Sequence, residues 1–353
     1  MSETTERSPD ALGPPGGGPG TRNGAGAGAV ILRGLGVFGR QREATVFVVA
    51  VVLLLYFGIR YNSTFVSRSN AIDLLSEITA PIAIIAIGEV LLLICGQIDL
   101  SVGFIYTFSP FVMYFLITYY GVPAFLAILL SLLMGLVVGW VNGFITVTLG
   151  VPSFITTLGT GFVLEGLVLT TSHAEPVDIP KSATSIGRWI GAAPWSQFIW
   201  AVVLVAIFHV VLTRTRWGLH TISVGGNQLG ARESGINTAR ITYGNFMITG
   251  VLGALVGLQV AFYTNTIDPS AGGYTPMFYS VTAAVIGGTA MLGGVGTILG
   301  AFLGAIVLST LIDGLNIAGV SANPLGIIFG GAILVAMIAN VRLARLRGEG
   351  KTP

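Results

Sequence analysis

Four acidic side chains stand inside long apolar stretches of this sequence, where they could carry chemistry. They are Glu89, Asp99, Glu165 and Asp313, and Glu77 lies near the end of another such stretch. A charge in hydrocarbon costs a few kcal/mol even on lenient scales, so such groups usually face other protein groups or a water-filled path. Each carboxylate could therefore line a path for ions or polar solutes, or could be a structural acceptor satisfied by its neighbours.

Asp99 has the most informative setting of the four. The segment Gly96–Gly103 reads GQIDLSVG and places polar groups between two glycines inside an apolar stretch. Irregular backbone at membrane depth is tolerated only where it lines a cavity or is buried in protein. Asp99 could cap the helix that follows it, and this structural role could coexist with a place on a transport path.

The patterns that would indicate an enzyme or a metalloprotein are missing from the sequence. The histidines, His173, His209 and His220, show no metal-ligand spacing, and no Ser/His/Asp arrangement can be proposed. Gly350–Thr352 ends like a phosphate-binding loop, but Arg345 stands where that motif has its first glycine, and no strand comes before it. We therefore expect no catalytic site, no metal and no nucleotide site in this chain.

Composition indicates an integral membrane protein. Of the 353 residues, 53% are hydrophobic and 9% are charged, whereas about 25% charged residues are typical of a soluble domain. The net charge of +2 is too small to indicate a nucleic-acid partner, and the single cysteine, Cys95, excludes an internal disulfide. The predicted fold is an all-α integral membrane protein of about ten transmembrane helices, with both termini cytoplasmic and with broken or re-entrant segments near the midplane.

The chain divides into three parts. Residues 1–43 are predicted to be a disordered Gly/Pro-rich cytoplasmic tail, because such a composition buries too little apolar surface to fold. Residues 44–341 form the transmembrane domain, with an inner loop at about 213–242, and residues 342–353 form a basic cytoplasmic tail. Ten apolar stretches, with nine or eleven possible, are expected at about 44–59, 72–95, 104–120, 124–149, 154–171, 198–212, 243–263, 278–292, 295–315 and 325–341. Pro81 is expected to kink the second of them.

Lysine and arginine predict the orientation. With ten spans and an inner N-terminus, residues 1–43, 213–242 and 342–353 hold thirteen of the 17 basic residues, and the outer loops hold the other four. The four outer residues are Arg60, Arg68, Lys181 and Arg188. This asymmetry predicts cytoplasmic termini and favours an even number of spans.

Glycines recur at four-residue spacing in three expected spans. The sets are Gly135/Gly139/Gly143, Gly253/Gly257 and Gly296/Gly300/Gly304. Small residues on one face let a neighbouring helix approach closely. Close structural packing is the simpler interpretation, and a helix that slides or tilts is the functional one.

The segment 226–236 is predicted to form a short polar helix that ends at Gly235, within the inner loop. A helix between two spans is a natural docking surface for a cytoplasmic partner, although a solvated connector would look similar. The residues that would present this surface are Asn227, Ala231, Arg232, Glu233, Ser234 and Gly235.

Five segments, taken in order, resemble one family: the permease subunits of ATP-binding cassette (ABC) importers for monosaccharides of the ribose, xylose and galactose type, in binding-protein-dependent transport family 2. The segments are Gly96–Gly103, Val151–Thr160, Gly226–Asn237, Val285–Thr297 and Asp313–Ser321. Gln97, Gly230 and Asp313 depart from the residues usual in that family, and the departures at Gln97 and Asp313 leave the identity of the substrate open. The resemblance covers about residues 70–340.

The resemblance implies a transmembrane permease that moves a pentose, hexose or related polyol into the cytoplasm by alternating access. Two permease copies, identical or paralogous, would form the pathway in the bacterial plasma (inner) membrane, surrounded by membrane lipid. A cytoplasmic ATPase would bind ATP and Mg and dock on loops such as 226–237, and an extracytoplasmic sugar-binding protein would deliver the solute. No cofactor is expected in this chain itself.

A neutral sugar needs hydrogen-bonding groups along its path rather than ion pairs. The candidate pathway residues are Gln97, Asp99, Ser101, Asn142 and Asn316. Asp99 and Asn316 are hypothesised to line or shape the path, and Arg232 and Gly235 to serve docking of the ATPase.

Other functions stay open at this point. An ABC permease for branched-chain amino acids, nucleosides or a furanosyl signalling molecule would share the architecture. A secondary transporter driven by ions would need a coupling carboxylate, for which Glu89 or Glu165 could serve. An intramembrane enzyme is poorly supported, because the sequence shows no catalytic constellation.

Overall fold

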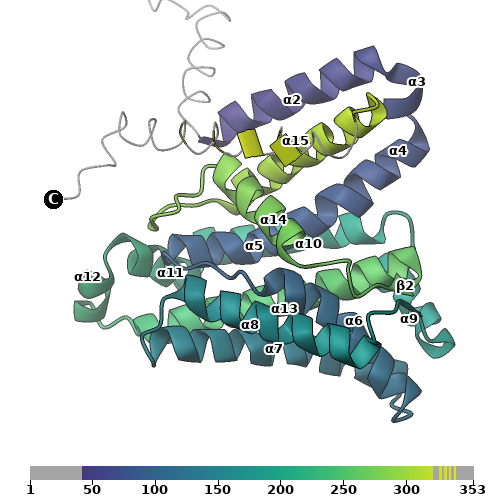
Figure 1. Cartoon of the computed structure of the whole chain (residues 1–353). Coiled ribbons are helices and arrows are strands. Elements are labelled where there is room, and N and C mark those ends of the chain that lie inside the picture. Colours follow the sequence, from purple (N-terminus) through teal and green to yellow (C-terminus); the bar gives the residue numbers. More distant parts are fainter. Residues whose placement is uncertain (1–41, 321–325, 328–329, 332–333, 335–337, 339–353) are drawn as a thin grey trace, which may run out of the picture. The chain divides into compact units, whose positions relative to one another are not determined.

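The computed structural model describes residues 42–320 and the isolated positions 326–327, 330–331, 334 and 338, all within the unit Gln41–Pro353. Helices running side by side make up most of it (Figure 1). The predicted tails, apart from residues 42–43, and most of the expected span 325–341 lie outside the described residues.

Seven helical segments of the described chain are long and apolar enough to cross a membrane. They are α2 (Arg42–Arg60, from Glu43), the combined segment Arg68–Ile94, α7 (Ala124–Val147), α8 (Ser153–Ser172), α10 (Ser196–Arg214), α13 (Thr238–Thr264) and α15 (Ile298–Ile317). An eighth apolar helix, α6 (Val102–Thr118), is shorter and contains Pro110. These helices confirm the predicted helical membrane fold. Helices suit a bilayer because they satisfy their backbone polar groups internally.

The second span is interrupted at the point where the sequence predicts a kink. It starts as α4 (Arg68–Ile72), widens into a π-helix, η1 (Asp73–Thr79), and continues as α5 (Ala80–Ile94) with Pro81 in its first turn. Proline has no N–H and its ring crowds the carbonyl four residues earlier. The wider π turn removes that conflict without ending the helix. A short helix, α3 (Asn62–Phe65), joins this span to α2.

The eighth expected span, 278–292, is wrong in its bounds. The helix there, α14 (Tyr274–Ile286), has 13 residues, which gives about 20 Å at 1.5 Å per residue against a hydrocarbon thickness of about 30 Å. A non-helical segment follows up to α15, in which Gly288, Gly293 and Gly294 have positive φ. L-residues with a side chain rarely adopt that backbone conformation, so the glycines end the helix early and leave a half-length element.

The centre of the described unit is α5. Each of its residues from Ala80 to Ile94 is buried, and it packs against α10, α13, α14 and α15 (Figure 1). The largest buried apolar cluster contains nearly all of its aliphatic side chains. A helix that is apolar all round is expected to be enclosed by other helices.

Glycines on α7 and α13 form a close seam between these two helices. A Cβ at Gly135 would collide with the carbonyl of Gly250, and one at Gly139 with the carbonyl of Phe246. Gly257 of α13 stands in the same way against the backbone of Tyr106 on α6. The prediction of glycine faces for close packing is therefore confirmed for these helices.

The segment between α8 and α10 forms short elements of its own. Its strand β1 (Val177–Asp178) pairs antiparallel with β2 (Thr266–Ile267), with Val177 opposite Ile267. After β1 come η2 (Lys181–Ala183), α9 (Thr184–Gly187) and η3 (Arg188–Ala192). Gly191 brings η3 against the backbone of Gln259 on α13, so these turns cover the end of the bundle opposite to α11 (Arg216–Gly226) and α12 (Gln228–Glu233).

Candidate functional site

The loop between α5 and α6, residues 95–101, is fastened to α8 through its backbone. Ile98 N donates to Ser153 Oγ at 3.3 Å, and Leu100 N donates to Thr157 Oγ1 at 3.0 Å. Asp99 N points to Glu89 Oε2 of α5, at a long 3.5 Å. Backbone donors of an irregular segment within the bilayer must find such partners, because lipid supplies none.

Asp99 holds this loop in shape from inside. Its Oδ1 accepts from Ser101 N at 2.8 Å and from Ser101 Oγ at 2.6 Å, and its carboxylate accepts from Asn142 Nδ2 of α7 at 3.3–3.4 Å. All three side chains are completely buried. The bond to Ser101 N satisfies a backbone donor in the turn just before α6. It is not the helix cap that the sequence suggests, because Ser101 is the residue that precedes α6 and no side chain makes a cap bond there.

The five candidate pathway residues fall into two places. Asp99, Ser101 and Asn142 form the buried network just described, and Gln97 lies half-buried in the same loop. Asn316 lies apart from them, exposed in the last turn of α15. The neighbouring Asp313 accepts from Asn70 Nδ2 of α4 at 2.8 Å, so this part of α15 belongs to the end of the bundle opposite to α11 and α12.

The inner loop of the sequence analysis contains two helices rather than the one predicted, α11 and α12. Thr215 caps α11 by accepting from Gly218 N, and Asn227 caps α12 by accepting from Gly230 N at 2.9 Å. Gly235, at φ +80°, ends the motif. The sequence prediction missed the boundary between the two helices because a single residue, Asn227, both ends α11 and caps α12.

The predicted docking residues divide between an inner and an outer face of α12. Ala231 is buried and packs with Cys95, Val224 and Ile241. The outer face is formed by exposed residues, namely Asn227, Leu229, Arg232, Glu233, Ser234 and Gly235. Arg232 Nε donates to Thr238 Oγ1 at 3.0 Å, which ties this face to the first turn of α13.

A residue that sequence reasoning missed connects α11 to the membrane helices. Asn245 of α13 is fully buried. Its Oδ1 accepts from Trp217 Nε1 of α11 at 2.9 Å, and its Nδ2 lies 3.3–3.4 Å from Leu91 O, Cys95 Sγ and Thr221 Oγ1. An asparagine within an apolar span was the available signal, because such residues mostly bond across helices.

A backbone contact reinforces the same joint. Gly294 N donates to Ile94 O at 2.8 Å, and a Cβ at Gly225 would collide with that carbonyl. The end of α11, the end of α5 and the glycine segment before α15 therefore meet without intervening side chains. We call Gly225, Asn245, Ile94 and Gly294 the α11 joint. The α11 joint connects α11 directly to α5 and α13.

No group of three or more His, Cys, Asp or Glu side chains in the described chain is placed to hold a metal ion. The geometry instead defines a multi-pass membrane protein in which a short helical segment outside the spans is firmly joined to the most buried helix. Such an arrangement would suit a component of a membrane transporter, in which a partner acts on the short helices.

Comparison with known proteins supports that class. The family described as "Branched-chain amino acid transport system / permease component" matches residues 72–338, and the chain belongs to this family. It is a permease component of an ABC importer and has no catalytic function of its own. No solved structure matches the chain.

Three relatives are similar along most of their length. The chain is 36% identical over 308 residues to the xylose/arabinose import permease protein XylH of Sulfolobus acidocaldarius, covering 85% of each protein. It is 33% identical over 286 residues to the ribose import permease protein RbsC of Bacillus subtilis, covering 78% of this chain and 86% of that protein. It is 28% identical over 303 residues to the fructose import permease protein FrcC of Rhizobium meliloti, covering 83% and 84%.

Proposed function

We propose that this chain imports a monosaccharide, as the permease subunit of an ABC importer in the bacterial plasma membrane. One observation carries the proposal: the similarity to the xylose/arabinose, ribose and fructose import permeases extends over roughly four fifths of the chain. The family description names branched-chain amino acids, whereas XylH, RbsC and FrcC are named for sugars.

The chemistry around loop 95–101 agrees with a neutral cargo. Asp99 already accepts from three donor groups, namely Ser101 N, Ser101 Oγ and Asn142 Nδ2, so we propose that its carboxylate serves the loop rather than a cation. We propose that these three residues shape the path and that the half-buried Gln97 meets the solute directly. Asn316, exposed at the opposite end, is proposed to meet the solute near its entry.

The orientation follows from the basic residues. Arg214, Arg216, Arg232 and Arg240 are exposed around α11 and α12, at one end of the described bundle. The opposite end also carries exposed basic residues, namely Arg60, Arg68, Lys181 and Arg188. We therefore propose that the end with α11 and α12 is cytoplasmic on the count over the whole sequence, in which thirteen of the 17 basic residues belong to the segments expected on that side. The proposal keeps about ten transmembrane helices and two cytoplasmic termini, as the sequence predicts.

Energy would enter through α11 and α12. An ATPase docked on the outer face of α12 would push or pull α11, and the α11 joint would pass that displacement to α5 and α13. An extracytoplasmic binding protein would load the solute at the other end. These partners are those of the permease family.

The second permease copy is proposed to pack on α8. This helix exposes Phe154, Phe162 and Val163, and a Cβ at Gly159 or Gly166 would meet nothing within 4 Å in the described chain. Small residues beside large apolar ones on an open helix face are typical of helix association in membranes.

The proposal is tested by uptake in a strain that lacks this gene. Cells complemented with the chain are offered radiolabelled xylose, arabinose, ribose, fructose and leucine. Restored uptake of one or more sugars, abolished when the partner ATPase is inactivated, supports the proposal. Restored uptake of leucine alone would contradict the proposal and would identify the chain as an amino-acid permease.

A further inference from the structure

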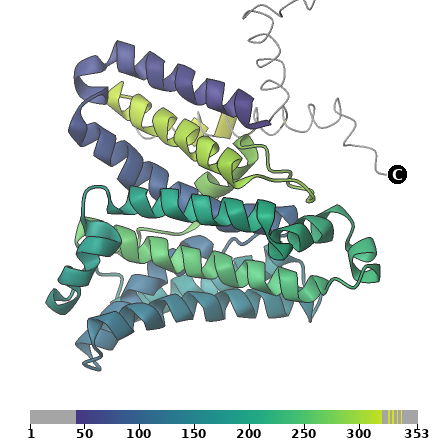
Figure 2. The ribbon, with the colours of Figure 1, turned by 180° about the vertical axis from the view of Figure 1, so that it is seen from behind.

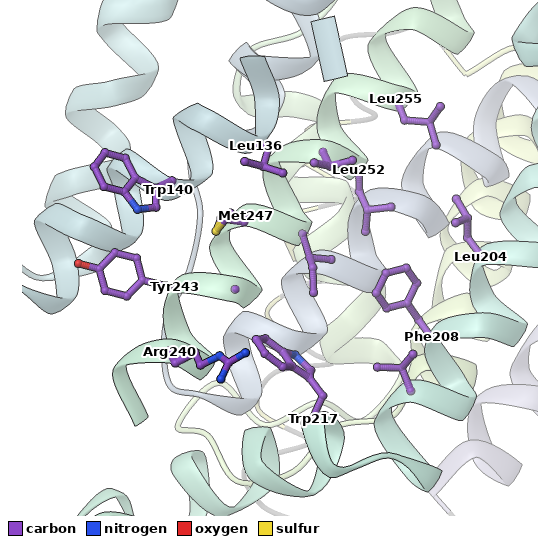
Figure 3. A pocket seen from close by; sticks show the side chains of 14 residues that line it. Leu136, Trp140, Leu204, Phe208, Trp217, Arg240, Tyr243, Met247, Leu252 and Leu255 are labelled. Carbon is purple, nitrogen blue, oxygen red and sulfur yellow. The ribbon is translucent and has the colours of Figure 1, made fainter. Parts of the chain in front are cut away.

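A large apolar groove lies between α7, α10 and α13, with Trp217 of α11 at one side (Figure 3). None of its lining residues belongs to loop 95–101 or to α8. Its volume is about 910 Å³, which is near the upper end of ligand pockets at roughly 300–1,000 Å³. Figure 2 shows these three helices side by side on the face turned away from the viewer in Figure 1. The lining residues that carry the argument are Trp140, Trp217, Arg240, Tyr243, Val251 and Leu255.

The groove changes character along its length. Leu204, Leu252 and Leu255 line one part, whereas the other part has the rings of Trp140, Trp217 and Tyr243 and the guanidinium of Arg240 (Figure 3). Arg240 and Leu255 are 15 positions apart on α13, which is about 22 Å at 1.5 Å per residue. This distance exceeds the hydrocarbon depth of one leaflet, which is half of about 30 Å, so the groove is long enough to hold an acyl chain whose headgroup lies at Arg240.

Arg240 stands at the polar mouth of this groove without a carboxylate partner in the described chain. It is exposed in the first turn of α13, and Arg214 and Arg216 are exposed at the junction of α10 with α11. Tryptophan and tyrosine beside such cations are typical of the level of the lipid headgroups. The mouth therefore offers positive charge to an anion that is attached to something apolar.

We propose that this groove binds an anionic phospholipid, with its acyl chains against Val251 and Leu255 and its phosphate at Arg240. A sugar does not fit the lining, because its hydroxyls would be left without partners against leucine, valine and phenylalanine. Packing of a second permease copy against this groove would not require a lining that changes from apolar to cationic along its length. It would also not require an arginine without a carboxylate partner at the mouth. The site does not depend on which solute the importer carries.

The bound lipid would touch the α11 joint. Trp217 lines the groove and also donates from Nε1 to Asn245 Oδ1. A chain that fills the groove presses the indole ring against α13 from the membrane side. Lipid occupancy thereby stabilises the position of α11, on which the ATPase is proposed to act.

The test uses the delipidated full-length protein in mild detergent, with native mass spectrometry to count bound lipids. Phosphatidylglycerol and phosphatidylcholine are added separately to the wild type, to Arg240→Gln, to Val251→Trp and to Arg188→Gln. Arg188 is an exposed arginine of η3 at the other end of the bundle, so its variant is the matched control. All variants are first checked for an unchanged melting curve.

We expect one tightly held phosphatidylglycerol per chain and weaker phosphatidylcholine. Arg240→Gln should weaken phosphatidylglycerol about fivefold, the change that about 1 kcal/mol per arginine near an anionic surface gives. Val251→Trp should weaken both lipids, and Arg188→Gln neither. Equal retention of the two lipids, or a preference for phosphatidylglycerol that survives Arg240→Gln, would overturn the site. Loss of sugar uptake has no bearing on these readouts.

A photoreactive phosphatidylglycerol gives a second measurement on the wild-type protein. Cross-linked peptides from α10 and α13 are expected after digestion. Cross-links confined to other helices would contradict the proposal. Protein-to-protein cross-links from this face would identify a second copy as the occupant instead.

Discussion

Asn142 on α7 donates from Nδ2 to Ser101 Oγ at 2.8 Å, while Ser101 Oγ itself donates to Asp99 Oδ1 at 2.6 Å. The hydroxyl is thus both acceptor and donor between two helices and a loop, with all three side chains completely buried. The Asn142 amide oxygen has no partner in the described chain, but the donors of Asn142 and Ser101 are satisfied, and buried hydrogen bonds of this kind restrict the conformation of the surrounding backbone. The loop at the centre of the proposed pathway is therefore held by a relay that reaches across to α7.

Replacing Asn142 should weaken this loop. Asn142→Leu removes a donor from Asp99 and Ser101, and an unsatisfied buried polar group costs about 1–3 kcal/mol. We expect a lower melting temperature of the purified protein and a matching loss of sugar uptake. Ser131→Ala on the same helix is the control, because the Ser131 hydroxyl bonds only to Ala127 O within its own helix. An Asn142→Leu protein with wild-type melting and uptake would disprove the role of the relay.

The glycine seam between α7 and α13 should not tolerate a side chain. Gly139→Ala places a methyl group against the Phe246 carbonyl, and overpacking of this kind costs about 1–3 kcal/mol. Gly166→Ala on α8 is the matched control, because its Cβ meets nothing within 4 Å in the described chain. Thermal unfolding in detergent compares the two. If Gly139→Ala and Gly166→Ala melt at the same temperature, α7 and α13 can move apart at Gly139 without cost, and the close seam does not contribute to stability.

The bond from Trp217 to Asn245 should matter for coupling more than for folding. Trp217→Phe keeps an aromatic ring but leaves Asn245 Oδ1 without its donor, and Asn245→Leu removes the acceptor. Each change should lower the solute-stimulated ATPase rate of the assembled importer, and the double variant should cost less than the sum of the two.

The control for this pair is the basal ATPase rate without solute, which should stay near the wild-type value. Additive effects of the two variants on the stimulated rate would show that the two residues act independently.

The outer face of α12 should be needed for docking of the ATPase. Arg232→Ala removes an exposed guanidinium, and Gly235→Ala forces a residue with a Cβ into φ +80°, at roughly 1–2 kcal/mol. Both variants should release the ATPase during affinity purification. Arg216→Ala, on the first turn of α11, is the matched surface change. If both variants retain one equivalent of the ATPase, the docking surface does not lie on the outer face of α12.

Glu89 distinguishes an ATP-driven permease from an ion-coupled transporter. It is fully buried in α5 and lies 3.5 Å from Asp99 N through Oε2. Glu89→Gln keeps the shape and an acceptor oxygen, so uptake should stay within about twofold of the wild type if no ion is coupled there, since a change of that size is well below 1 kcal/mol. Uptake measured with and without an ionophore provides the comparison. Abolished uptake in a stably folded Glu89→Gln protein would favour ion coupling.

The sequence by itself determined the class of this protein. A low charge content together with long apolar stretches leaves a helical membrane fold as the solution, because backbone polar groups have no partners in lipid. The spans at 124–149 and 154–171 agree with α7 and α8 to within two residues. The resemblance over about residues 70–340 agrees with the family match over residues 72–338. These features are local, so the order of residues along the chain carries them.

Only the tertiary structure decided which polar groups meet. Asp99, Ser101 and Asn142 come from a loop and a distant helix, and their pairing depends on how α6 and α7 pack. Sequence grouped Asn316 with them, but it lies at the other end of the bundle because α15 runs away from the α11 joint. The same holds for Asn245 and for the groove at Arg240, since both are made by helices that lie far apart in the chain and come together through burial of their apolar faces.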